Sequence, residues 1–201
     1  MFSLAASGTL GKAIVFATWK GIAYVRKHAI PANPKSAAQI SMRAMMRFLS
    51  QIWDGLTTAN KATWDARAAV TNVSPFNAFV GFNQSLWNTF RGPTKEDPAT
   101  ETGAGGLAPT TTITAGVKEL SLSIADGATP PDWGWLIHSS LTTGFTPSRS
   151  TIIAAVERTA TPTIYLHTPL TTGVAVYYRI QGFSDDSVLG TLEAETTGTP
   201  T

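Results

Sequence analysis

The chain of 201 residues is 43% hydrophobic, enough to bury one large core or two small ones. It contains no cysteine, which excludes a disulfide framework, a thiolate nucleophile and a cysteine-ligated metal site. The net charge of +2 hides an asymmetry: residues 1–97 hold eleven Lys and Arg against four Asp and Glu (net +7), and the remainder holds four against nine (net −5). We therefore expect two regions that meet different surroundings, with the basic one facing nucleic acid, an acidic protein lattice or solvent.

The first predicted element is a β-hairpin, preceded by a small apolar segment, 1–11, that is either a flexible arm or an added strand. Two runs rich in β-branched and aromatic residues, 12–19 and 22–27, flank Lys20-Gly21, which is typical of a hairpin turn. Because a two-stranded ribbon is marginal alone, we expect it to pack on the helices that follow or on a neighbouring subunit. We assign its apolar side chains to two faces: Ile14, Phe16, Ile22 and Tyr24 on one, and Val15, Trp19 and Val25 on the other.

The segment after the hairpin changes from extended chain to helix. Pro31 and Pro34 fix backbone angles and exclude a helix before them. Asn33 or Ser36 is placed to cap the first helical turn, and Gln39 lies three residues after Ser36, as a capping box requires. The sequence therefore predicts a rigid arm that leads into a capped helix.

This first helix, predicted to end near Gly55, is amphipathic and basic. Its apolar stripe consists of Ile40, Ala44, Met45, Phe48 and Ile52. A second stripe carries Arg43, Arg47 and Gln51. Such a pattern indicates an interaction surface and not a catalytic site.

Two further helices are predicted from their start signals. One begins at Thr57 or Thr58, where a threonine can cap, and runs to about Val70. The other begins at Ser74-Pro75, a cap followed by proline at the first helical position, and closes at Arg91-Gly92-Pro93. The residues that recur at helical spacing along it are Phe76, Phe79, Val80, Asn83, Trp87 and Phe90. We expect the three helices to pack their aromatic faces together over the hairpin.

Residues 95–112 contain three glycines and two prolines with little to bury, and they predict a linker. Beyond them the hydrophobic period changes to two, and about six or seven short strands separated by turn residues predict an antiparallel sandwich that buries Trp133 or Trp135. The predicted fold class is therefore α+β in two domains. These are a hairpin and three-helix domain (1–94) and, after the linker (95–112), an all-β sandwich (113–201).

No catalytic or metal-binding constellation can be assembled from the sequence. Gly103-Ala-Gly-Gly106 lacks the strand, helix and lysine of a phosphate loop, and Asp185-Asp186 fits a strand-connecting turn better than a calcium site. His28, His138 and His167 are isolated, and the last two lie in apolar strand patterns. We therefore expect no enzyme activity, no cofactor and no metal, and equally no signal peptide or membrane-spanning segment.

Several landmarks follow one another in a fixed order within residues 8–92. They are Gly11-Lys12, the hairpin, Pro31 to Gln39, Arg43, Phe48, Trp53, Leu56, Trp64, Phe79 and Asn83. This order resembles a module in structural proteins of tailed bacteriophages, which reads Gly-Lys, hairpin, Pro-x-Asn-Pro-basic-Ser/Thr-x-x-Gln, Arg, aromatic, a Trp-bearing helix and a Phe-x-x-x-Asn helix. Separately, residues 113–196, with Tyr177 to Ile180 as a late strand, resemble an immunoglobulin or fibronectin type III sandwich, although the first strand lacks a Pro-Ser start.

The resemblance implies a non-enzymatic virion structural protein that anchors to the capsid or neck by its basic N-terminal domain. The sandwich would be displayed outward in a decoration or cement role. The implied partners are other virion proteins of the capsid, neck or tail, within a homo-oligomer, and no membrane is involved. The expected contact residues are Arg26, Lys27, Pro31, Asn33, Pro34, Lys35, Gln39, Arg43 and Arg47.

Two alternatives remain open at this point. One is a nucleic-acid-binding protein whose basic helix follows the phosphates. The other is a tail or baseplate component that binds host surface carbohydrate, with Trp133 and Trp135 as stacking platforms. Exposed tryptophans would favour carbohydrate binding, whereas buried ones would indicate core packing.

Overall fold

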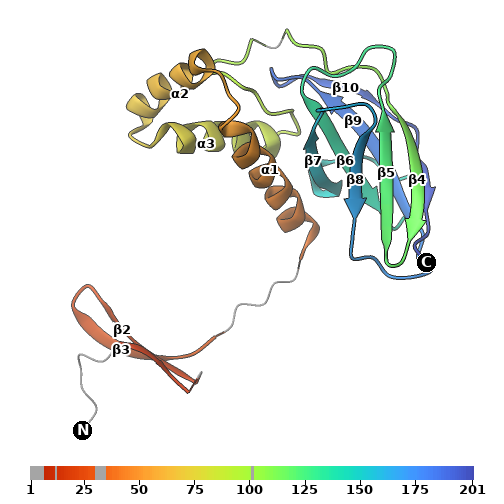
Figure 1. Cartoon of the computed structure of the whole chain (residues 1–201). Coiled ribbons are helices and arrows are strands. Elements are labelled where there is room, and N and C mark those ends of the chain that lie inside the picture. Colours follow the sequence, from red (N-terminus) through yellow and green to blue (C-terminus); the bar gives the residue numbers. More distant parts are fainter. Residues whose placement is uncertain (1–6, 12, 30–34, 101) are drawn as a thin grey trace. The chain divides into compact units, whose positions relative to one another are not determined.

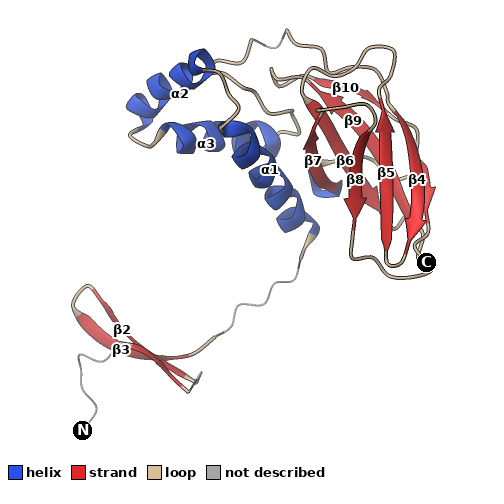
Figure 2. Cartoon of the chain, viewed as in Figure 1, coloured by secondary structure: helices blue, strands red, loops and turns tan. Residues whose placement is uncertain are grey.

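The computed structural model describes residues 7–11, 13–29, 35–100 and 102–201. Its contacts divide the chain into two compact units, Met1–Lys35 and Ser36–Thr201. Figure 1 follows the chain by colour, and Figure 2 distinguishes helices from strands. The predicted fold class is confirmed, because a hairpin and three helices precede an all-β region. The division between units, however, falls before the helices and not within 95–112.

The first unit contains a three-stranded antiparallel sheet with the strand order β1-β2-β3. Its strands are β1 (Gly8–Leu10), β2 (Ile14–Trp19) and β3 (Ile22–Lys27). Lys20 and Gly21 connect β2 to β3 with φ angles of 49° and 81°, the positive values that a type I′ turn requires at both central positions. The predicted hairpin is therefore confirmed, and the segment before it contributes an added strand (Figure 2).

The register of the hairpin corrects the predicted composition of its two faces. The two-residue turn pairs Trp19 with Ile22, and directly paired residues lie on the same face of a sheet. Tyr24, two residues along β3, shares that face with them. Val25 pairs with Phe16 and lies on the opposite face. The predicted faces were wrong because they were based on the alternation within each strand. That alternation does not show which face of β2 lies on the same side as which face of β3; the pairing of Trp19 with Ile22 decides it.

Three helices open the second unit: α1 (Ala37–Trp53), α2 (Thr58–Thr71) and α3 (Pro75–Asn88). Thr57 caps α2 by accepting a hydrogen bond from the Asn60 backbone N–H (3.2 Å), and Ser74 caps α3 by accepting one from the Asn77 N–H (3.2 Å). Ser36 occupies the N-cap position of α1, but its side chain makes no capping hydrogen bond. The predicted capping box is therefore wrong, since it requires that bond.

The remaining strands form two antiparallel sheets. The smaller sheet has the order β4-β5-β8, and the larger has the order β10-β9-β6-β7, with β11 also pairing with β9 (Figure 1). The strands are β4 (Thr110–Gly116), β5 (Glu119–Ala125), β6 (Gly134–Ser140), β7 (Ile152–Glu157), β8 (Thr163–His167), β9 (Val176–Phe183), β10 (Leu189–Leu192) and β11 (Thr196–Gly198). Burial alternates along β5 and β9, as the predicted period of two requires.

An inner core fills the space between the two sheets. Its buried side chains are Leu120, Leu122, Ile124, Trp135, Ile137, Ala154, Val176, Tyr178 and Ile180. The Tyr178 hydroxyl reaches His167 Nδ1 at 2.7 Å, so the phenol has a polar partner within the sandwich.

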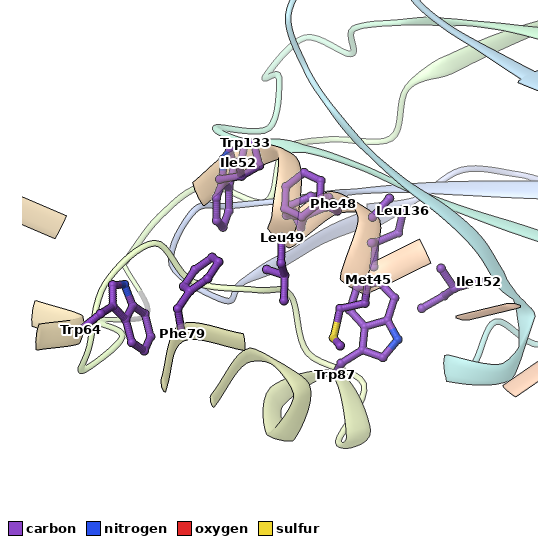
Figure 3. Packing of buried hydrophobic residues seen from close by; sticks show 12 residues of the cluster. Met45, Phe48, Leu49, Ile52, Trp64, Phe79, Trp87, Trp133, Leu136 and Ile152 are labelled. Carbon is purple, nitrogen blue, oxygen red and sulfur yellow. The ribbon is translucent and has the colours of Figure 1, made fainter. Parts of the chain in front are cut away.

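The helices cover the outer face of the larger sheet through a second core, whose side chains are drawn in Figure 3. Phe48 of α1 meets Trp133 and Phe183 edge-on, with ring centroids 5.2 Å from each. The second unit therefore has three layers: helices, larger sheet and smaller sheet. The predicted packing of the helical aromatic faces over the hairpin is corrected, because these faces are buried by one another and by the larger sheet.

The predicted linker begins with a segment fixed to the helices. The Trp64 indole Nε1 donates a hydrogen bond to the Lys95 carbonyl (2.8 Å). Asp97 forms an ion pair with Arg67 (2.6 Å). A sequence-based prediction misses these bonds because the partners lie about thirty residues earlier in the chain.

The same segment is then fixed to the sandwich. Asp186, a side chain that is only 3% exposed, accepts hydrogen bonds from the backbone N–H groups of Thr100 and Thr102, both at 2.6 Å. The Gly105 backbone packs directly on Gly190, where an added Cβ would lie 2.2 Å from the Gly190 nitrogen. The helices and the sandwich are therefore one compact unit, and the linker predicted between them is an ordered connection.

Candidate partner-binding surface

The N-terminal sheet has exposed apolar side chains on both faces. Among the described residues of the first unit, none is buried. Trp19 is 65% exposed and Ile22 is 69% exposed, and Leu10, Ile14, Tyr24 and Val25 are exposed as well. A small sheet without a packed face is marginal in water. Exposed apolar side chains gathered in this way make this sheet the candidate interaction surface of the described residues.

We name one side of this sheet the aromatic face. It consists of Val15, Trp19, Ile22, Tyr24 and Arg26, which the register places together. Trp19, Ile22 and Tyr24 line an open hollow on it. Large amphipathic aromatic side chains are enriched in protein interfaces because they bury much area at a low entropy cost.

The opposite side of the sheet consists of Leu10, Ile14, Phe16, Val25 and Lys27. Each face therefore ends in a cation, Arg26 on one and Lys27 on the other. The Lys20 ammonium lies over the Trp19 ring, 4.9 Å from its centroid. Residues 1–35 contain five Lys and Arg and no Asp or Glu. The surface is thus both apolar and uniformly positive.

The structure places the predicted contact residues in separate groups. Arg26 and Lys27 are exposed on β3, whereas Gln39, Arg43 and Arg47 recur every four residues along an exposed side of α1. Lys35 is exposed, with a positive φ of 48°. The three remaining predicted contacts, Pro31, Asn33 and Pro34, lie outside the described residues.

Both tryptophans proposed for carbohydrate stacking are buried. Trp133 is 8% exposed and packs under α1, and Trp135 is fully buried between the sheets. Neither indole presents a face to a sugar, so their assignment as stacking platforms is corrected to core packing. The residues that sequence analysis missed are Trp19, Ile22 and Tyr24, whose signal was a hairpin with apolar residues on both faces.

The two histidines in the sandwich, His138 and His167, each have a side-chain hydroxyl as hydrogen-bond partner. His138 is buried beside Phe90, and its Nδ1 lies 2.9 Å from the Thr151 hydroxyl. Burial lowers the pKa of His138 to about 4, so the ring is neutral at neutral pH. Burial also lowers the pKa of His167. Within the described part of the chain, no three potential metal-ligating side chains cluster, and no helix is long and apolar enough to cross a membrane.

Comparisons with known proteins describe the sandwich only. No family model and no curated protein matches the chain. Among solved structures, similarity is found to a β-1,2-glucanase from Parabacteroides distasonis (14% identity, 47% of this chain and 12% of that one, TM-score 0.38). Others are a structure described as a myokine (13%, 48% and 99%, 0.37) and a Fn3-like protein from Clostridium thermocellum (23%, 45% and 91%, 0.33).

These values carry no argument about activity, and the chain spans only about an eighth of the glucanase. The class is defined by the fold itself. One antiparallel sheet has three strands and the other has five, and β8, the fifth strand of this region along the chain, returns to the smaller sheet. This arrangement makes a fibronectin type III-like sandwich. In this chain the larger sheet carries a helical layer, and a separate small sheet precedes it.

Proposed function

We propose that this protein is a non-enzymatic structural component of a tailed-phage virion. The N-terminal sheet anchors it to the capsid or neck, and the helix-covered sandwich is displayed as a decoration or cement module. The observation that carries this proposal is the N-terminal sheet, which is apolar on both faces, uniformly basic and without a buried side chain among its described residues. The ordered landmarks along residues 8–92, which resemble a phage structural module, supply the class of partner.

The energetics favour display in many copies. Burying Trp19, Ile22 and Tyr24 contributes about 2 kcal/mol each. Association costs roughly 4–15 kcal/mol in lost translational and rotational freedom. One aromatic face therefore gives weak binding, and repeated attachment to a lattice, or to a homo-oligomer that binds it, compensates through effective concentration.

The test is co-sedimentation of the purified protein with virions or empty capsids of its source. The triple substitution Trp19→Ala, Ile22→Ala, Tyr24→Ala should abolish co-sedimentation. The matched control is Val70→Ala with Val117→Ala, two exposed apolar positions of the second unit, which should co-sediment like the wild type. If the triple variant still co-sediments fully, the anchor is elsewhere.

A second candidate function is nucleic-acid binding, which the five cations and absence of acids in residues 1–35 favour. It predicts binding to DNA that falls steeply with salt and that Arg26→Glu with Lys27→Glu weakens. Virion anchoring through the aromatic face instead predicts binding that depends on Trp19 and falls less steeply with salt than DNA binding does. Measuring both ligands over the same salt series separates the two functions.

A further inference from the structure

The second unit has a groove at one side of the sandwich. It is bounded by the edge strand of each sheet, β7 and β8, and by α1 (Figure 1). Its volume is about 350 Å³. Its lining includes Arg47, Gln51, Glu157, Ile164, Tyr165 and Leu166. This groove is distinct from the N-terminal sheet and lies wholly within the second unit.

The opposite side of the sandwich is closed by the chain itself. The Thr191 N–H beside the β10 edge donates a hydrogen bond to the Gly106 carbonyl (2.9 Å). On β4, the Thr111 N–H donates to the buried carboxylate of Glu193 (2.6 Å). One backbone N–H on each of these two edge strands is therefore satisfied within the protein. Among the described residues, β7 pairs only with β6, and β8 pairs only with β5.

The β8 strand is short and lies between Pro162 and Pro169, but within its own residues it carries no lysine, proline or bulge. Natural edge strands carry lysine, proline or bulges that prevent pairing with another chain. The β8 sequence, Thr-Ile-Tyr-Leu-His, contains none of these. Ile164 is 60% exposed and Leu166 is 48% exposed on its outward side. An added strand would find unpaired backbone groups and two apolar side chains there.

Helix α1 supplies a charge at the same place. Arg47 of α1 and Tyr165 of β8 both line the groove. Among the described residues no carboxylate forms an ion pair with Arg47. Gln51, one turn further along the helix, offers an amide to the same space. Arg47 is thus positioned to receive a carboxylate from whatever lies along β8.

We propose that this groove binds an extended segment of a partner protein, which adds a strand to the free edge of β8 and places an acidic side chain against Arg47. Backbone hydrogen bonds to β8 give affinity, Ile164 and Leu166 accept alternating apolar side chains, and Arg47 selects the acidic residue. This inference does not depend on the N-terminal sheet, and its test needs no virion.

The test titrates the full-length protein with a short synthetic peptide of alternating threonine and valine that contains one glutamate, followed by amide NMR. Shifts should concentrate on β8 and the flanking part of α1. A peptide with lysine in place of the glutamate should bind at least about tenfold more weakly. Shifts on β4 or β10, or equal binding of the two peptides, would overturn the proposal.

Three variants separate charge and edge contributions. Arg47→Glu should reverse the preference between the glutamate and lysine peptides, while Glu157→Gln, which removes the other charge of the groove, should not weaken the glutamate peptide. Leu166→Lys should reduce affinity about tenfold by protecting the edge. Its matched control, Val117→Lys at an exposed turn, should bind normally. If light scattering instead shows a dimer that Leu166→Lys abolishes, a second copy fills the groove and the proposed partner is wrong.

Discussion

The N-terminal sheet and the larger sheet of the sandwich use similar residues with opposite results. In β3, every residue from Ile22 to Lys27 is exposed. In β6, the run from Gly134 to His138 is entirely buried. The larger sheet has the helices on one face and the smaller sheet on the other, whereas the described part of the first unit has no second layer. Apolar strands become a core only where another layer covers them, and otherwise their apolar side chains stay exposed.

The largest test of this comparison exchanges a ring for a methyl group in each region. Phe48→Ala should lower the free energy of unfolding by about 3–5 kcal/mol, because it empties the contact between α1 and the larger sheet. Trp19→Ala should change it by less than about 0.5 kcal/mol, because Trp19 packs on no core. Urea unfolding followed by circular dichroism measures both. A loss of several kcal/mol for Trp19→Ala would mean that the N-terminal sheet shares the main core.

The next effect concerns pH and His138. Its pKa is about 4 in the folded state and about 6.5 when unfolded, so only the unfolded chain gains a proton as the pH falls between these values. Stability should therefore be complete above pH 6.5 and decline by about 3 kcal/mol towards pH 4. His138→Gln should flatten most of this decline, leaving the part due to His167, whose pKa is also lowered.

The control for the substitution itself is His28→Gln in the first unit. Its midpoint of urea unfolding at neutral pH should match that of the wild type, because His28 lies outside both cores. If His138→Gln shows the same pH dependence of unfolding as the wild type, the loss of stability in acid comes from other groups. Protonation of His138, beside Phe90, would then not be its cause.

A smaller effect is expected at the connection between helices and sandwich. Asp186→Asn should cost about 2 kcal/mol, because the carboxylate accepts the backbone N–H groups of Thr100 and Thr102 and an amide has only one acceptor oxygen. Asp185→Asn, which breaks a partly exposed ion pair with Lys95, should cost at most about 1 kcal/mol. Limited proteolysis near Thr100 should accelerate in the first variant alone. Equal cleavage in both would contradict the fixed connection.

Much of the fold was predictable because its signals are local. Lys20-Gly21 specifies the hairpin turn, Thr57 and Ser74 mark two helix starts, and alternation along Leu120 to Ile124 specifies a strand. These features depend on neighbours in the chain. They are therefore visible without any tertiary contact.

What the sequence did not predict depends on distant partners. The helices could have covered any apolar layer, and only the outward side chains Trp133, Leu136 and Phe183 make the larger sheet that layer. The glycine-rich connection looked flexible because its acceptor, Asp186, lies more than eighty residues later. For the candidate surface, the basic residues of β3 were predicted, but Trp19 and Ile22 were not, since the pairing across the turn decides their common face.

The smallest effect tests where the second unit begins. Ser74→Ala should cost about 1 kcal/mol, because it removes the bond that caps α3, whereas Ser36→Ala should cost almost nothing, because Ser36 caps nothing with its side chain. Thermal unfolding of the two variants measures the difference. An equal loss at Ser36 would mean that the first turn of α1 is fixed by its own cap. The cooperatively folded structure of the second unit would then include Ser36, its first residue.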